Sequence, residues 1–112
     1  MERGPKNADH LQGTLDLLIL KTLERGSNHG FGVALDIQET SEGLLRVEEG
    51  SLYPALHRME RDGVIAGEWR LTDKGRRARF YTLTAVGKRR LAEVESNWTT
   101  VALGVRRVLR SA

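Results

Sequence analysis

The sequence predicts an α+β fold that is mainly α-helical, with one small β-hairpin and a long C-terminal helix. Three observations carry this prediction. Apolar residues recur at helical spacing in three short segments before residue 63, two β-rich runs flank a polar turn, and an apolar heptad repeat fills the C-terminal end. A chain of 112 residues has room for one modest core. We therefore expect a flexible arm at 1–10, a compact domain at 11–84 and a separate helix at 85–112.

The first helix is expected to begin at Thr14 and to end before Gly26, because Thr is a good N-cap and Gly a good helix stop. Residues 1–10 are polar and interrupted by a Gly-Pro pair, which favours an arm outside the helix. Leu17 and Leu20 widen the apolar stripe of this helix beyond a single face. That width indicates a helix that is buried or covered by a second surface.

Two further helices are expected at about 31–41 and 49–62. His29 comes before the earlier one and is expected to hydrogen-bond at its start. The later one is followed by Gly63, which stands where a helix stop belongs. Its inner face has apolar residues at spacings of four and three, namely Leu52, Leu56 and Met59.

After residue 63 the pattern changes to two β-rich runs, at 64–71 and 78–83, around a polar turn at 72–77. This arrangement predicts a β-hairpin. Thr84 follows directly and has the character of an N-cap for the last helix.

The last helix carries an apolar seam with heptad spacing, formed by Leu91, Val94, Trp98, Val101, Val105 and Val108. A helix that follows the hairpin has little of its own domain left to cover such a seam. We expect part of the seam to lie on Leu17 and Leu20 of the first helix and the rest to pair with a second copy about a two-fold axis. These eight residues are the candidate dimerisation set. Packing wholly within one protomer is the alternative.

Three short helices followed by a hairpin is the element order of a winged helix-turn-helix. In that design the third helix enters the DNA major groove, and the hairpin, or wing, reaches the backbone or the minor groove. Residues 1–50 carry five basic and nine acidic residues, a net charge of −4, whereas residues 51–112 carry thirteen and six, a net charge of +7. Side chains suited to base edges and phosphates lie on the third helix, at Tyr53, His57, Arg58 and Arg61, and on the hairpin, at Lys74, Arg76, Arg77 and Arg79. The predicted partner is therefore double-stranded DNA.

Several classes of function find no support in the sequence. Cysteine is absent, which excludes a disulfide scaffold, a cysteine nucleophile and a cysteine-based metal site. His10, His29 and His57 lack the spacing of metal ligands, and no nucleophile–base pair is indicated, so we expect no metal, no cofactor, no catalytic residue and no enzyme activity. No apolar run approaches a membrane span, and the N-terminus lacks the apolar core of a secretory signal. We expect a cytoplasmic protein with no membrane partner.

Four segments resemble the PadR family of bacterial transcriptional regulators, namely residues 15–20 (LDLLIL), 29–32 (HGFG), 50–60 (GSLYPALHRME) and 81–87 (YTLTAVG). The third segment is the most specific, and the single C-terminal helix is similar to that of the compact subfamily. The resemblance implies a homodimeric DNA-binding regulator, usually a repressor that a small effector releases. It extends the expected DNA contacts to Ser51 and Pro54. It also makes Trp98 a candidate site for a small aromatic effector, with a tryptophan packed in the dimer core as the alternative.

The residues and the family resemblance together predict a sequence-specific transcriptional regulator that binds a palindromic operator as a homodimer. The resemblance further implies that this regulator is a repressor. Two recognition helices in such a dimer match half-sites about 34–36 Å apart. A different class of function fits the same basic surface, namely a winged-helix interaction module that docks an acidic protein partner. Steep salt dependence of duplex binding favours the first, because a protein that neutralises phosphates releases counterions.

Overall fold

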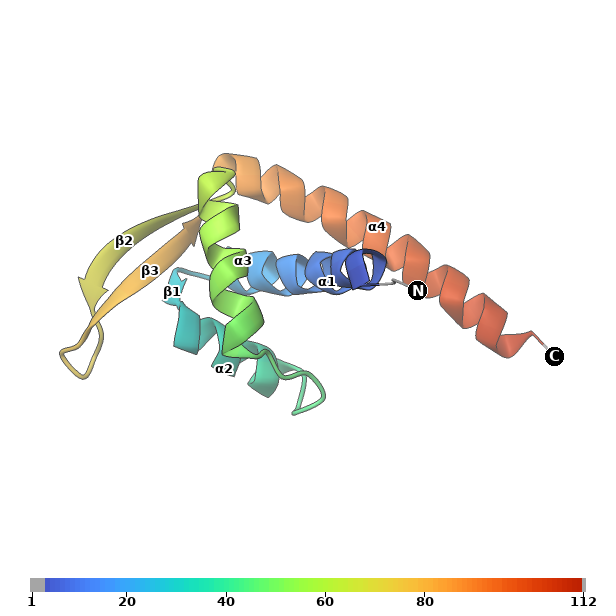
Figure 1. Ribbon diagram of the computed structural model, residues 1–112, viewed down its shortest axis with the longest axis horizontal. Coiled ribbons are helices and arrows are strands. Elements are labelled where there is room, and N and C mark those ends of the chain that lie inside the picture. The colour runs from blue at the N-terminus through green and yellow to red at the C-terminus, as the bar shows by residue number, and fades with distance from the viewer. Residues whose placement is uncertain (1–3, 112) are drawn as a thin grey trace.

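The computed structural model describes the backbone of residues 4–111 and the side chains of residues 13–111. Over that range the chain forms four helices and three strands, in the order α1 (Gly4–Glu24), β1 (Asn28–His29), α2 (Gly30–Thr40), α3 (Glu49–Arg61), β2 (Ile65–Leu71), β3 (Arg77–Leu83) and α4 (Ala85–Arg110). In Figure 1, α3 stands between the β2–β3 wing on one side and α1 and α4 on the other. The predicted mainly helical α+β architecture is confirmed.

The wing is antiparallel and carries a third, two-residue strand at its edge. The strand order is β1-β3-β2, with Trp69 opposite Arg79 in the register of β2 and β3 and Asn28 opposite Tyr81 in that of β1 and β3. The sequence did not indicate β1, because two residues are too few to show the alternation that identifies a strand. This strand ties the start of α2 to the wing.

The core lies where α1, α2, α3 and the base of the wing meet. The predicted inner face of α3 is confirmed, because Leu52, Leu56 and Met59 are at most 2% exposed. Because burying apolar surface is the dominant favourable term in folding, this face holds α3 on the domain. The opposite face of α3 is left open to solvent. The largest fully buried side chains of the whole core are Ile19, Leu20, Val33, Leu52, Leu56, Met59, Val64 and Ile65.

α1 begins at Gly4, well before the N-cap that was expected at Thr14. Thr14 lies inside the helix, so the predicted start is wrong. The physical reason is that Pro5 falls in the first helical turn, where its missing N–H has no intrahelical partner to lose. The predicted flexible arm at 1–10 lies partly outside the described residues, and its boundary with the domain falls within α1.

Two side chains cap helices as expected. His29 Nδ1 accepts a hydrogen bond from the backbone N–H of Gly32 at 3.0 Å at the start of α2. Thr84 Oγ1 accepts one from the backbone N–H of Gly87 at 3.0 Å at the start of α4. Each cap satisfies a backbone donor that has no partner within its helix. The starts of α2 and α4 are thereby fixed by their own sequence.

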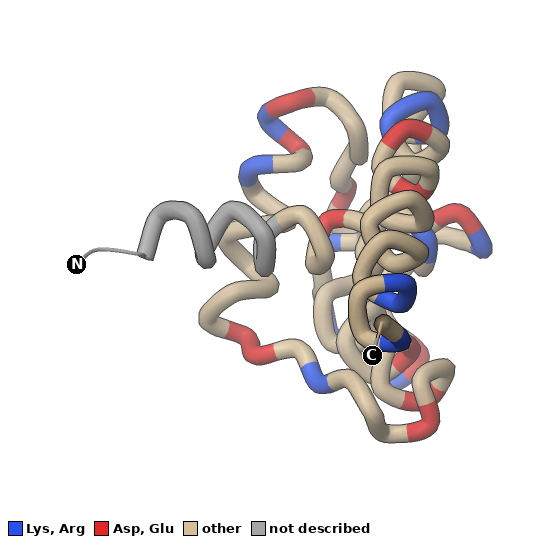
Figure 2. Tube along the Cα trace, turned by 90° about the vertical axis from the view of Figure 1, so that its right-hand side faces the viewer, with Lys and Arg blue, Asp and Glu red and all other residues tan. Residues whose placement is uncertain are grey.

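α4 is divided between the core and solvent. Its N-terminal half packs on α1, with Leu91 buried at 3% exposure, while its C-terminal half extends beyond the rest of the domain (Figure 1). Figure 2 views this helix from its C-terminal end and shows basic residues near both ends, with acidic residues and then an uncharged stretch between them. None of the helices in the described part of the chain is long and apolar enough to cross a membrane.

Candidate DNA-binding surface

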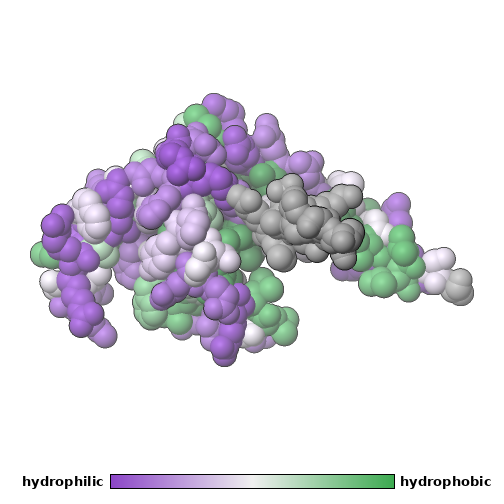
Figure 3. Space-filling view, viewed as in Figure 1, coloured by the Kyte–Doolittle hydropathy of each residue, from purple (hydrophilic) through white to green (hydrophobic). Residues whose placement is uncertain are grey.

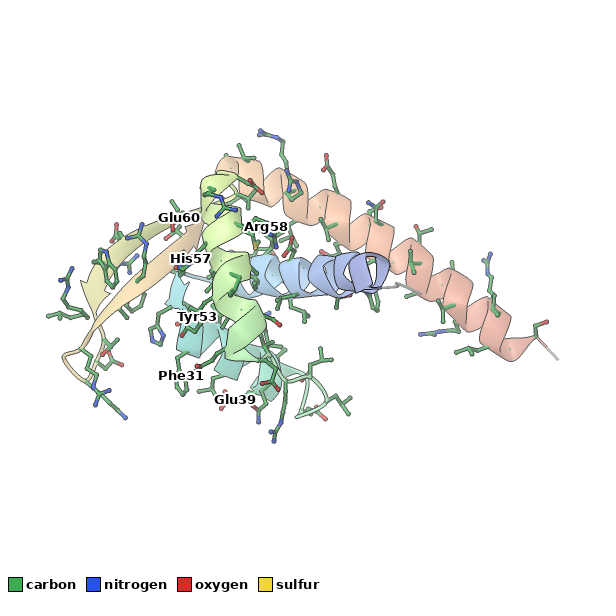
Figure 4. All side chains as sticks on the ribbon, viewed as in Figure 1. Phe31, Glu39, Tyr53, His57, Arg58 and Glu60 are labelled. Atoms are coloured by element: carbon green, nitrogen blue, oxygen red, sulfur yellow. The ribbon has the colours of Figure 1, made fainter. Side chains whose placement is uncertain are left out.

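α3 presents a row of side chains on the face opposite the core. Tyr53, His57 and Arg61 recur every four residues, which places them on one side of the helix, and all three are exposed. We call these three residues the recognition stripe. Figure 4 shows Tyr53 and His57 on the side of α3 that faces the wing. Ser51 and Pro54 are also exposed and lie nearer the start of the helix.

Tyr53 is held in place by close contact with the start of α2. A Cβ built on Gly30 would lie 2.6 Å from Tyr53 Cε1, so a larger residue at position 30 would displace the ring. This contact accounts for the glycine after His29 in physical terms. It also sets the position of the tyrosine hydroxyl at the edge of the recognition stripe.

Arg58 points away from the recognition stripe, toward α1. Its Nη1 and Nη2 donate hydrogen bonds to Asp16 Oδ2 and Oδ1 at 3.1 and 2.7 Å. The two side chains are only 27% and 22% exposed, and the hydrogen bonding of Arg58 to the Asp16 carboxylate raises the pKa of Arg58. Figure 4 shows Arg58 on the α1 side of the helix. Arg58 therefore joins α3 to α1, a different role from the base contact predicted for it.

The tip of the wing holds three exposed basic side chains, those of Lys74, Arg76 and Arg77. The turn is closed by a hydrogen bond from the backbone N–H of Thr72 to the carbonyl of Arg76 at 2.7 Å. Gly75 takes a φ of +80°, which residues with a side chain rarely adopt. The turn thus presents the three cations to solvent at the end of the wing.

Arg79, the fourth basic residue predicted on the wing, is turned back toward α3. Its Nη2 lies 2.5 Å from Glu60 Oε2, and this contact lowers the pKa of the Glu60 carboxyl. A Cβ on Gly67 would lie 2.8 Å from Arg79 Nε, so glycine leaves the room for the guanidinium. Like Arg58, Arg79 forms an internal ion pair, whereas the other eight predicted DNA-contacting residues are exposed.

The eight residues of the predicted dimerisation set lie on α1 and α4 and differ in burial. Leu20 and Leu91 belong to the protomer core, at 1% and 3% exposure, which agrees with the expectation that part of the seam packs on the first helix but removes these two residues from the dimerisation set. Burial of Leu91 follows from the packing of α4 on α1. Leu17 and Val94 are half-buried, whereas the exposed members are Trp98, Val101, Val105 and Val108. Figure 3 shows apolar side chains gathered on this projecting end of α4.

A family model described as the transcriptional regulator PadR-like family matches residues 19–93. The match covers most of the helix-turn-helix, the whole wing and the start of α4. The chain belongs to this family. The resemblance identified from the sequence is therefore confirmed.

Relatives of known structure share the fold over nearly the whole chain. A PadR family transcriptional regulator from Eggerthella lenta is 28% identical, with a TM-score of 0.75 over 96% of this chain and 93% of that one. A PadR-like transcriptional regulator from Bacillus cereus is 26% identical, with a TM-score of 0.76 over 93% and 99%. A transcriptional regulator of Mycobacterium tuberculosis is 46% identical over 56 residues, which are 50% of this chain and 51% of that protein.

Membership in the PadR-like family settles the broad class of function. The chain is a transcriptional regulator with a winged helix-turn-helix, and its family membership supports DNA as the partner. PadR-like proteins are regulators, which confirms the expectation that this one is not an enzyme.

Sequence reasoning missed three residues that shape this surface. Asp16 and Glu60 neutralise two of the basic side chains, and Trp69 on β2 lies beside the wing arginines. Asp16 and Glu60 lie within the segments that resemble the family, but nothing local indicated the roles of the three residues, because each acts through a partner elsewhere in the sequence.

Proposed function

We propose that this PadR-like protein is a sequence-specific repressor that binds a palindromic operator as a homodimer. The recognition stripe enters the major groove, and Lys74, Arg76 and Arg77 contact phosphates on the adjacent backbone. The observation that carries the proposal is the separation of the cations into two groups. Acidic side chains hold Arg58 and Arg79 inward, and the stripe and wing tip stay exposed on neighbouring elements.

The exposed end of α4 supports the homodimer. Val101, Val105 and Val108 are 61%, 51% and 73% exposed and lie at heptad spacing on one side of the helix. Contiguous exposed apolar surface of this kind is typical of an interface. A two-fold dimer through this end of α4 presents two recognition stripes, which suits two half-sites about 34–36 Å apart.

Trp98 lies within the same surface and is 47% exposed. We propose that it packs at the dimer interface, where an aromatic side chain contributes a large buried area. An effector role predicts that a flat aromatic compound quenches its fluorescence. A titration of DNA-free protein with proflavine, in wild type and Trp98→Phe, separates the two: saturable quenching that is lost in the variant supports an effector site.

The DNA-binding proposal is tested by titrating a labelled duplex from upstream of the protein's own gene at several salt concentrations. We expect log Kd to depend steeply on log salt, and a scrambled duplex of equal composition to bind more weakly. Arg76→Ala is expected to reduce the salt slope by about 1 unit, the loss of one phosphate contact. Arg107→Ala, at the far end of α4, is the matched control and should leave the slope unchanged.

The same assay addresses the alternative of an acidic protein partner. Polyglutamate competes strongly with the duplex if the basic surface is built for acidic polypeptides, and weakly if it is built for DNA. Flat salt dependence, or equal affinity for the upstream and scrambled duplexes, contradicts sequence-specific DNA binding.

A further inference from the structure

One face of the wing carries an exposed aromatic side chain to which the proposed function assigns no role. In the register of β2 and β3, Trp69 lies opposite Arg79, and Arg77 stands two residues along on the same face. Trp69 is 57% exposed, which is unusual for so large an apolar side chain. Core packing therefore does not explain why a tryptophan occupies this position.

Both arginines of this face approach the indole. The guanidinium carbon of Arg77 lies 5.1 Å from the ring centroid of Trp69, and that of Arg79 lies 5.6 Å away. These distances are within the range of cation–π attraction. Because Glu60 holds Arg79 at 2.5 Å, a continuous set of contacts runs from the recognition helix through Arg79 and Trp69 to Arg77.

We propose that Trp69 is a positioning residue that holds Arg77 in place for contact with the DNA phosphate backbone. The inference rests on the proposed role of the wing in DNA binding. An exposed arginine samples many rotamers and loses this freedom when it binds. Stacking on an indole that is tied to α3 removes part of that loss before the DNA arrives, which strengthens binding.

Arg76 provides the internal comparison. It is the neighbour of Arg77 on the wing and is exposed to solvent, but among the described residues only Arg77 and Arg79 have a guanidinium against Trp69. A contribution of Trp69 that acts through Arg77 therefore depends on Arg77 and is independent of Arg76.

The test is a double-mutant cycle read by the fluorescence anisotropy of a labelled mixed-sequence duplex at low salt. Trp69→Leu removes the ring, and Trp69→Phe keeps an aromatic face. We expect Trp69→Leu to weaken binding about two- to fivefold, as for an exposed cation–π contact, and Trp69→Phe to retain most of the affinity. In an Arg77→Ala background Trp69→Leu should have no further effect, whereas in an Arg76→Ala background its full effect should persist.

A second readout needs no DNA. In the NMR spectrum of the free protein, the Nε–H proton of Arg77 is expected to be shifted upfield by the indole ring current. This shift should vanish in Trp69→Leu, while the corresponding signal of Arg76 stays unchanged. Because Trp69 is largely exposed, we expect both variants to unfold at nearly the wild-type temperature.

The outcomes separate this inference from the proposed function. An equal loss of affinity from Trp69→Leu with and without Arg77 shows that the indole itself touches DNA, and overturns the positioning role. No loss in the wild-type background overturns it as well. In both cases the proposed function stands, because the wild type still binds. A wild-type protein that fails to bind the duplex at any salt concentration removes both proposals together.

Discussion

Arg58 on α3 donates two hydrogen bonds to the carboxylate of Asp16 on α1, 42 residues earlier in the chain. Both side chains are about three-quarters buried, and a paired geometry of this kind holds an arginine in a single orientation. The pair fixes how the recognition helix lies across α1. It also removes from the DNA-binding surface a basic residue that lies on the same helix as the recognition stripe.

Arg58→Ala is expected to lower the free energy of unfolding by about 1–3 kcal/mol, because it leaves a partly buried carboxylate without its partner. Asp16→Asn should have a similar effect, and the double variant should lose less than the sum of the two. Urea unfolding of the four proteins measures this coupling. The salt slope of duplex binding should not change in Arg58→Ala, and a fall of about 1 unit with full stability retained would show instead that Arg58 contacts a phosphate.

Val105→Asp is expected to convert the proposed homodimer into a monomer. The side chain is exposed in the protomer, so the substitution places a charge on the proposed interface without disturbing the core. Sedimentation velocity reports the oligomeric state. Ser96→Asp is the matched control, because position 96 lies on the opposite side of α4, and it should remain dimeric. Equal sedimentation of wild type and Val105→Asp contradicts the proposed interface.

Thr84→Ala is expected to cost about 0.5–2 kcal/mol of stability, because the hydroxyl caps α4. Its Oγ1 accepts from the N–H of Gly87 at 3.0 Å and donates to the carbonyl of Gly63 at 2.7 Å, so one group joins the end of α3 to the start of α4. Thermal unfolding followed by circular dichroism measures the loss. Thr84→Ser keeps the hydroxyl and should retain most of the stability. A Ser variant as unstable as the Ala variant would assign the effect to the methyl group.

The Glu60–Arg79 pair is expected to make stability depend on pH in the acid range. Arg79 lowers the pKa of the Glu60 carboxyl in the folded protein below its ordinary value of 4.5. A carboxyl whose pKa is lower when folded stabilises the protein above the unfolded pKa, and this contribution is lost as the pH falls through the folded pKa. The advantage of wild type over Glu60→Gln in melting temperature should therefore be full at neutral pH and shrink below about pH 4.5.

Glu93→Gln, at an exposed position of α4, serves as the control for the acid-range prediction, since it removes a carboxyl without breaking this pair. A gap between wild type and Glu60→Gln that stays constant from neutral pH into the acid range contradicts a stabilising role for the ionised pair.

Local signals in the sequence were enough to predict most of the fold. The apolar spacing of Leu52, Leu56 and Met59 identifies the buried face of α3, and Thr84 identifies the start of α4. The failures have local causes as well. β1 is too short to alternate, and the Gly4-Pro5 pair indicates a break in the helix although the first helical turn accepts proline.

The sequence by itself determined the order of the elements, the family and the outward stripe of Tyr53, His57 and Arg61, because helical period and capping are properties of neighbouring residues. Only the tertiary structure decided which cations remain available to DNA. Arg58 pairs with a carboxylate 42 residues away in the sequence, and Arg79 with one 19 residues away. Helical or strand periodicity predicts the face on which a side chain lies, but it does not predict which residue of another element contacts that side chain. The same reason divides the seam of α4 into a part that closes the protomer core and a part that stays exposed to solvent.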